Sequence, residues 1–500
     1  MIRRVQDAGF AGARPTLAPS AERMLFVVGF SAVGLAISIS APFVLIALLA
    51  VFVGVAYTRI SPGDPTSLAT IAIGALFVIP ARFVIGPLGA AGTPAVLVGL
   101  GSIGWWIADR MMQRPAFARD FQPARLALFA LLTAMLVGYG AGWSRTLSPL
   151  EGRNADRSVI VWIGMAGLLL LVADGVRTRT RLDELIHRLV LAGSFMSAIA
   201  IIQFTLKWDP TDLISVPGLT ENVPDVTDGL FRSEFQRVAG TAWHPIEFAV
   251  VAASILPLAV YRALSLTHLP PIGRWFPVVL LGFAIPMALS RSAILGILVV
   301  GIVLMPTLSP TNQLRLGSAG IGAASAMTVL IPGLLGTILS FFRHTSDDPS
   351  VQGRTEDFAR VEQFFSESPI WGRGFGTYTP VEYDFLDNQY FMTLIESGLI
   401  GLGALLLFFA VGFGLCAGVR RRATDEPTRT LAQALVASIA VHFVTFATYD
   451  ALVFRISGMA LFLSIGMAAA LWRLTRLKHP NYAEPRWFGP SAGADSVVIP

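Results

Sequence analysis

Four arginines in this sequence lie where a guanidinium group can bind an anion. Arg291 is flanked by apolar residues in PMALSRSAILG, and Arg237 precedes a Gly-Thr step in FQRVAGTAWHP. Arg354 and Arg373 belong to a long polar segment, residues 343–387. A guanidinium group is planar, stays charged and donates two hydrogen bonds to phosphate oxygens at once. An arginine near hydrocarbon is also costly unless it has a partner, so these residues predict a diphosphate-binding site.

Each of these arginines also has a simpler interpretation. An arginine at the membrane interface can serve as an anchor or form an ion pair with no role in chemistry. This alternative is as strong as the functional one for Arg291, and it is the favoured one for Arg373. His244 and Glu247 follow the other long polar segment and are candidate bases, but a helix-capping or buried-pair role explains each equally well.

The polar segment of residues 343–387 predicts a short amphipathic helix. In GRTEDFARVEQFFSESP, Thr355 is suited to cap the N-terminus and Pro369 to stop the helix. One face of this helix would carry Phe358, Val361, Phe364 and Phe365. Such a helix is expected to lie along the membrane surface and to roof a cavity.

The glycine-rich stretch WGRGFGTY follows that predicted helix. Gly372, Gly374 and Gly376 permit tight backbone turns that can offer N–H groups to an anion. A dinucleotide-binding loop, however, follows a strand and opens a helix, whereas this one follows a helix. A plain turn is therefore the favoured interpretation.

The composition places these polar segments in a membrane protein. The 500 residues are 54% hydrophobic and 14% charged, with a mean hydropathy of +0.66. A hydrocarbon core of about 30 Å needs roughly 20 apolar residues for each helical span. The fold class expected is all-α, a polytopic integral membrane helix bundle of about 12–14 transmembrane helices, with the amphipathic helix in a long outer loop.

Apolar runs give the expected organisation of the chain. We expect spans to start near residues 24, 42, 66, 87, 125, 158, 185, 244, 275, 292, 316, 388, 430 and 452. The first two belong to one apolar run, residues 24–57, which is either a tight hairpin or one long element. The predicted segments are a cytoplasmic N-terminus (1–23), N-terminal spans (24–206), a first outer loop (207–243), central spans (244–342), a second outer loop (343–387), C-terminal spans (388–472) and a cytoplasmic tail (473–500).

Basic residues set the expected orientation, because Lys and Arg are retained on the cytoplasmic side. Arginine clusters at residues 110–125, 177–188 and 420–422 fall on one side, and the two long loops fall on the other. The expected localisation is the inner, or plasma, membrane, with multiple passes and both termini cytoplasmic. The net charge of +5 is spread over many short loops, so no nucleic-acid partner is expected. Cys416 is the single cysteine, so no intramolecular disulfide can brace the loops.

The order of these motifs resembles a known family. SRSAILG, then GR in an outer loop, then SPIWGRGFGTY and DNQYFMTLIESGLIGLGALLLFF, together with the upstream RVAGTAWHP, is similar to the O-antigen ligase and O-antigen polymerase superfamily of bacterial membrane glycosyltransferases. The resemblance covers roughly residues 230–420. It implies an enzyme that takes a glycan from an undecaprenyl-diphosphate carrier and joins it to an acceptor glycan or lipid, without a metal or nucleotide cofactor.

The resemblance also implies roles for particular residues. Arg237 and Arg291 match the diphosphate-binding arginines, and the residue before Asn388 matches the general base, which is a histidine in the ligases and Asp387 here. A carboxylate has an unperturbed pKa of about 3.9 and is a weak base unless burial raises that pKa. Arg354, Arg373, His244 and Asn388 are the expected substrate-binding residues. Attack opposite the leaving diphosphate would invert the anomeric carbon.

Two functions are compared on this basis. The first is surface-polysaccharide or O-antigen polymerase or ligase activity on the outer face, with membrane lipids around the enzyme and a flippase or chain-length regulator as possible partners. The alternative is a multi-spanning transporter of a small solute or of lipid-linked sugars. Transporters are typically built from internal repeats and bind ligands at the bilayer midplane. This sequence has few midplane charges and two long loops on one side, which favours the transferase.

Overall fold

The computed structural model describes residues 64–111, 117–214, 216–222, 231–232, 235–267, 270–333, 336–337 and 349–476, with side chains left out for 231–232 and 349–356. The two spans expected before residue 60 lie outside this part of the chain. Each later expected span coincides with a helix, so the all-α membrane bundle is confirmed. Among the described residues, seven helices are long and apolar enough to cross a membrane, or eight if the bent pair η1 (Gly86–Gly92) and α4 (Pro94–Met111) is one span.

The N-terminal half of the described chain is built from helices joined by short connections. Its elements are α3 (Pro65–Phe77), β1 (Phe83–Val84), η1 (Gly86–Gly92), α4 (Pro94–Met111), α5 (Pro123–Gly142), α6 (Pro149–Gly175), α7 (Arg179–Leu206), η2 (Pro210–Leu213), β2 (Thr220–Glu221), β3 (Phe231–Arg232) and β4 (Phe235–Gln236). The strands form two short antiparallel pairs, β1 with β2 and β3 with β4.

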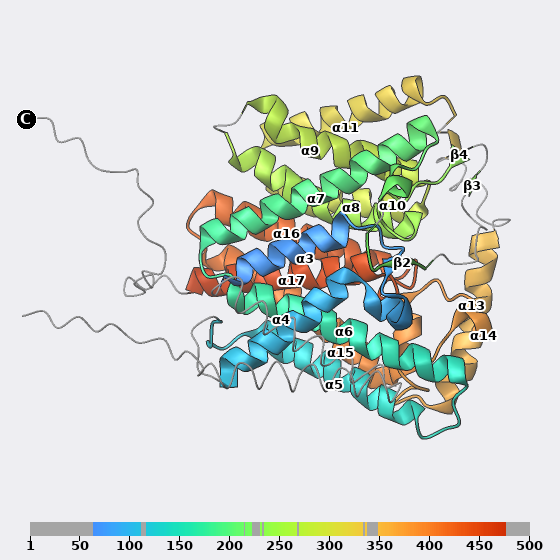
Figure 1. Ribbon diagram of the computed structural model, residues 1–500. Helices are drawn as coiled ribbons and strands as arrows, with labels where there is room; N and C mark the ends of the chain where they lie inside the picture. Colours follow the sequence, from blue (N-terminus) through green and yellow to red (C-terminus); the bar gives the residue numbers. More distant parts are fainter. Residues whose placement is uncertain are drawn as a thin grey trace, which may run out of the picture.

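The C-terminal half continues the bundle. Its elements are α8 (Pro245–Ser265), α9 (Pro271–Ala284), η3 (Ile285–Ala288), α10 (Arg291–Leu304), η4 (Met305–Thr307), α11 (Pro310–Leu330), α13 (Pro349–Glu367), α14 (Pro380–Tyr383), α15 (Gln389–Arg422), α16 (Glu426–Thr445) and α17 (Arg455–Arg476). In Figure 1, α13, α14 and the strands β2, β3 and β4 lie at the same end of the bundle.

Proline and capping residues explain many of the helix starts. Helices α3, α5, α6, α8, α9, α11 and α16 have proline in the first turn, where a missing N–H costs nothing. At α6, Ser148 and Glu151 form a complete capping box. The predicted cap at Thr355 is wrong, because α13 starts at Pro349, nearly two turns earlier. The predicted stop before Pro369 is confirmed by the end of α13 at Glu367.

Small residues allow the central helices to approach closely. A β-carbon on Gly99 of α4 would lie 2.2 Å from the carbonyl oxygen of Gly164 in α6, and one on Gly167 would lie 2.0 Å from that of Gly99. Side chains therefore cannot be accommodated at this crossing, as is usual where membrane helices pack through small residues. Helix α6 also packs against α17, whose membrane-length stretch is 89% buried inside the bundle.

Candidate active site

Arg237 and the N-terminus of α10 lie at the same end of the bundle. The Arg237 guanidinium is 6% exposed, and its Nε donates a hydrogen bond of 3.2 Å to the carbonyl oxygen of Ala288. Leu289 then reverses the chain with a left-handed backbone (φ 49°), and Arg291 is the first residue of α10. Arg237 thus bonds to the start of a short turn, and Arg291 follows the end of that turn.

The loop of residues 446–454, between α16 and α17, joins α10 to the start of α15. The Ser292 hydroxyl next to Arg291 hydrogen-bonds the Thr448 hydroxyl at 2.8 Å. The Asn388 side-chain amide donates to the carbonyl oxygen of Ala447 at 3.4 Å. Ser292 and Asn388, the chain neighbours of Arg291 and Asp387, therefore both hydrogen-bond to the same loop.

Gln389 fixes this loop to the first turn of α15. Its backbone N–H donates to the carbonyl oxygens of Phe446 and Tyr449, at 2.8 and 3.1 Å. Its buried side-chain oxygen accepts a hydrogen bond of 2.7 Å from the Leu452 N–H. Sequence analysis missed Gln389, although a glutamine at the start of an apolar helix is a signal that a buried polar partner is needed.

Asp387 is half-buried and interacts electrostatically with a second carboxyl group, that of Asp450. Burial, and then the charge of Asp387, raise the pKa of Asp450 from its usual 3.8 to about 8. Two neighbouring carboxyl groups do not readily ionise together, so this pair holds a proton near neutral pH. Asp450 was not predicted, although it is an isolated acid among apolar residues in TFATYDALVF, the pattern that marks functional acids in membrane proteins.

Asn388, and not Asp387, is the N-cap of α15. Its side-chain oxygen accepts hydrogen bonds from the N–H groups of Tyr390 and Phe391, at 2.9 and 3.2 Å. This assignment separates the two neighbours: Asn388 starts the helix, and the Asp387 carboxylate beside it is not needed for that purpose.

His244 and Glu247 have structural roles in the described contacts. His244 caps α8, with Nδ1 accepting a hydrogen bond of 3.2 Å from the Ile246 N–H, and its ring lies 5.7 Å from that of Phe454. Glu247 is fully buried and accepts hydrogen bonds from backbone N–H groups of Trp243, Ile456 and Ser457, at 2.9, 2.8 and 3.3 Å. The capping interpretation holds for His244, and Glu247 ties the start of α8 to the start of α17.

Arg373 is enclosed by aromatic and acidic side chains away from α10. Its guanidinium lies 4.5 Å from the ring centroids of both Phe364 and Tyr383, and it donates to the Tyr383 hydroxyl at 2.8 Å. Carboxylate oxygens of Glu151 and Glu367 lie 4.0 and 3.8 Å away. These contacts fit the ion-pair interpretation and do not bring Arg373 to Arg291, so its substrate-binding role stays a prediction. The Arg354 side chain lies outside the described part.

The glycine-rich stretch forms a turn, as favoured. Gly372, Gly374 and Gly376 all have positive φ, and a β-carbon on Gly372 would lie 2.3 Å from the backbone of Glu396 and Ser397. The N–H groups of Gly372 and Gly374 donate to the carbonyl oxygens of Ser368 and Glu396. Because these two donors bond to carbonyl oxygens of the protein itself, the turn packs on α15.

Helix α13 packs over the segment that leads to Asp387. Val361 and Phe364 are 7% and 9% exposed and contact a cluster that contains Tyr378, Leu386, Met392 and Ile395. Phe358 is 61% exposed, so the predicted apolar face is only partly buried. The residue before it, Asp357, is buried instead, and its carboxylate forms an ion pair with Arg360 at 3.2 Å.

The fold and site together define a polytopic helical membrane protein with arginines and a carboxyl pair at one end. Residues 276–406, about a quarter of the chain, match the family model described as O-Antigen ligase, so this segment is similar to that family. This match supports an enzyme of the O-antigen ligase type that acts on lipid-linked glycan and acceptor substrates. A search of curated proteins gave no match.

Proposed function

We propose that this protein transfers a glycan from undecaprenyl diphosphate to an acceptor sugar on the outer face of the inner membrane, as a surface-polysaccharide or O-antigen polymerase or ligase. The observation that carries the proposal is that Ser292, next to Arg291, and Asn388, next to Asp387, hydrogen-bond to one loop, while Arg237 bonds to the turn that precedes Arg291. Cationic donors and a carboxylate at one end of a membrane bundle are what transfer from a lipid diphosphate requires.

In the proposed reaction, Arg237 and Arg291 bind the diphosphate, and Asp387 accepts the proton of the acceptor hydroxyl. The acceptor oxygen then forms a bond to the anomeric carbon while the bond from that carbon to the phosphate oxygen breaks. The electron pair leaves with undecaprenyl diphosphate, whose developing charge the arginines stabilise. Attack from the opposite face inverts the anomeric centre. No metal or nucleotide takes part.

The carboxyl pair gives Asp450 a role in this scheme. If Asp450 holds the shared proton at neutral pH, Asp387 is left ionised and able to accept the acceptor proton. Helix α13, which packs over residues 378–395, would restrict access of water and limit hydrolysis of the activated sugar. The outer loops are also where a flippase or a chain-length regulator would contact the enzyme.

The test is to substitute Arg291 by lysine and to measure donor binding and glycan transfer separately. Lysine keeps the charge but loses the two-pronged hydrogen bonding, so transfer should fall by about 10²-fold while the protein still folds. Arg421→Lys, an exposed arginine at the other end of α15, is the matched control and should leave transfer unchanged. Normal transfer in both Arg291→Lys and Arg291→Ala would make Arg291 a membrane anchor and overturn the proposal.

The lipid-linked glycan that accumulates in a deletion strain separates the two activities. Single repeat units on the carrier indicate lost polymerisation, whereas long chains on the carrier indicate lost ligation. Accumulation on the inner leaflet only would instead support transport of the lipid-linked sugar.

A further inference from the structure

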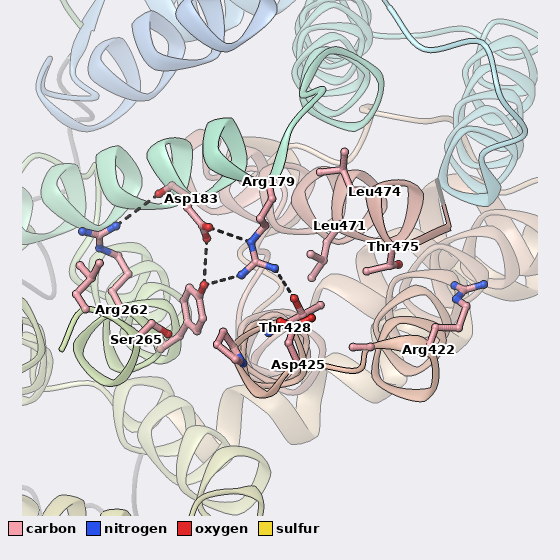
Figure 2. A pocket seen from close by; sticks show the side chains of 14 residues that line it. Arg179, Asp183, Arg262, Ser265, Arg422, Asp425, Thr428, Leu471, Leu474 and Thr475 are labelled. Carbon is pink, nitrogen blue, oxygen red and sulfur yellow. Dashed lines mark hydrogen bonds and ion pairs between the residues drawn. The ribbon is translucent and has the colours of Figure 1, made fainter. Parts of the chain in front are cut away.

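A cavity of about 510 Å³ lies at the end of the bundle where α8, α15 and α17 finish and α7 and α16 begin. This is the opposite end from α14 and the start of α15, so the cavity is separate from the candidate active site (Figure 1). Figure 2 shows its side chains, which come from all five helices and the short α15–α16 connection. A volume of this size is in the range of pockets that bind small molecules.

One wall of the cavity is a fixed polar cluster around Arg179. The guanidinium donates to the Asp183 carboxylate, the Thr428 hydroxyl and the Tyr261 hydroxyl, at 2.9, 2.9 and 2.6 Å (Figure 2). Since three of its hydrogen-bonding groups are used within the protein, Arg179 shapes the cavity more than it offers charge to a ligand.

Two other arginines of the lining retain hydrogen-bonding capacity. Among the described residues, Arg262 makes one long hydrogen bond, 3.5 Å from NH1 to the carbonyl oxygen of Asp183. Arg422 lies 5.2 Å from the Trp472 ring and has no hydrogen bond or ion pair to any other residue that the structure describes. Arg476 lies 4.7 Å from the same ring. Two guanidinium groups on one indole concentrate positive charge beside the cavity.

The charges of the lining do not cancel. Among the described lining residues, the three arginines Arg179, Arg262 and Arg422 are accompanied by two carboxylates, those of Asp183 and Asp425. Asp425 is engaged as the N-cap of α16 through a 2.9 Å hydrogen bond from the Thr428 N–H. The remaining lining is partly apolar, with Leu266, Pro427, Leu471 and Leu474. The cavity therefore combines excess positive charge with hydrocarbon contact, which suits an amphiphile with an anionic headgroup.

We infer that this cavity binds an anionic phospholipid, with the phosphate of its headgroup at Arg422 and the lipid chains against Leu471 and Leu474 of α17 (Figure 2). Basic pockets between membrane helices at the cytoplasmic surface are suited to anionic lipid headgroups, and each basic residue near the surface adds about fivefold in affinity. The inference does not depend on the proposed transferase activity.

The experiment measures lipid binding to the purified full-length protein in mixed micelles. Phosphatidylglycerol, phosphatidylcholine and inorganic phosphate are added separately, and bound lipid is quantified by native mass spectrometry alongside the shift in Tm. Phosphatidylglycerol should be retained and should raise Tm, whereas phosphatidylcholine and inorganic phosphate at equal concentration should do neither. Equal effects of inorganic phosphate and phosphatidylglycerol would reduce the site to an anion site and overturn the lipid assignment.

Variants locate the binding. Arg422→Gln should weaken phosphatidylglycerol binding by about fivefold, the contribution expected of one arginine. Arg421→Gln is the matched control, since Arg421 is exposed, adjacent and outside the cavity lining, and it should bind as the wild type does. Thr475→Glu, which places a carboxylate in the lining without removing any arginine, should weaken binding similarly. Unchanged binding in the folded Thr475→Glu protein, or equal loss in Arg421→Gln, would refute the inference.

Discussion

Replacing Asp387 by asparagine tests the proposed base with the least change of shape. The substitution removes the negative charge and the ability to accept a proton, but it keeps the size of the side chain. General base catalysis contributes about 10² to 10⁴ in rate. We therefore expect transfer to fall by that factor, which is ~2.7 to ~5.4 kcal/mol of activation free energy. Binding of the lipid-diphosphate donor should change little.

The structure predicts that this loss of activity occurs without a loss of stability. The cap of α15 is Asn388, whose side-chain oxygen accepts two backbone hydrogen bonds, so Asp387→Asn leaves the cap in place. Removing the Asp387 charge also removes a repulsion on Asp450, which should bring the pKa of Asp450 down toward its ordinary value. Thermal unfolding of Asp387→Asn at neutral pH should accordingly occur at the wild-type temperature or above it.

Two capping variants provide the comparison. Asn388→Ala should lower stability by about 0.5 to 2 kcal/mol, the usual effect of a lost N-cap. Asp425→Ala removes the cap of α16 at the opposite end of the bundle and should lower stability by a similar amount with transfer unchanged. The assay follows product formation and donor binding with purified lipid-linked donor. Full activity in Asp387→Asn would refute the role as base and direct attention to Asp450 and His244; parallel loss of donor binding would assign Asp387 to substrate positioning.

The remaining predictions concern stability and topology. Because the pKa of Asp450 is raised to about 8, the free energy of unfolding should be highest near pH 4 as far as this group is concerned, and should fall by up to ~1.4 kcal/mol per pH unit until about pH 8. Asp450→Asn should flatten the dependence of Tm on pH, and an equally steep profile in this variant would contradict the raised pKa of Asp450. Cysteine at exposed Ser366 should react with an impermeant thiol reagent in intact cells and cysteine at exposed Ser309 should not; labelling at Ser309 alone would reverse the orientation. Gly372→Ala should unfold at a clearly lower temperature, since its β-carbon would meet backbone at 2.3 Å, whereas Gly282→Ala, with no atom within 4 Å, should unfold at or above the wild-type temperature; equal Tm values would show that the turn can rearrange.

The helices of the described chain were predictable because their signals are local. An apolar run of sufficient length with proline in the first turn specifies a helix and its start without reference to distant residues. The start of α13 was missed because Pro349 and Thr355 both satisfy the local rules for a helix beginning. Burial of the α13 face was only partly predicted, since it depends on how Tyr378 and Leu386 pack beneath it.

The arginines and the first acid of the candidate site were predicted from the sequence, but the side chains that they contact were not. Arg373 lies among Phe364, Tyr383 and Glu151, and the last of these comes from a helix more than two hundred residues earlier in the chain. The interaction of Asp387 with Asp450 likewise joins the start of α15 to the far end of α16. Residue type and spacing identify groups that need partners, whereas only the packing of distant helices determines which partners they obtain.

The loop that carries Asp450 is held at both ends by two buried residues, through the backbone N–H and side chain of Gln389 and the side chain of Glu247. Gln389 binds residues 446, 449 and 452, and Glu247 binds the N–H groups that begin α17. Burying an amide and a carboxyl group in this bundle is costly unless their hydrogen bonds are satisfied, and the satisfied bonds leave the loop little freedom. The electrostatic effect of Asp387 on the pKa of Asp450 depends on the distance between the two carboxyl groups. The hydrogen bonds of Gln389 and Glu247 therefore fix the loop in place, as the proposed roles require: Asp387 as the base and Asp450 as the protonated acid beside it.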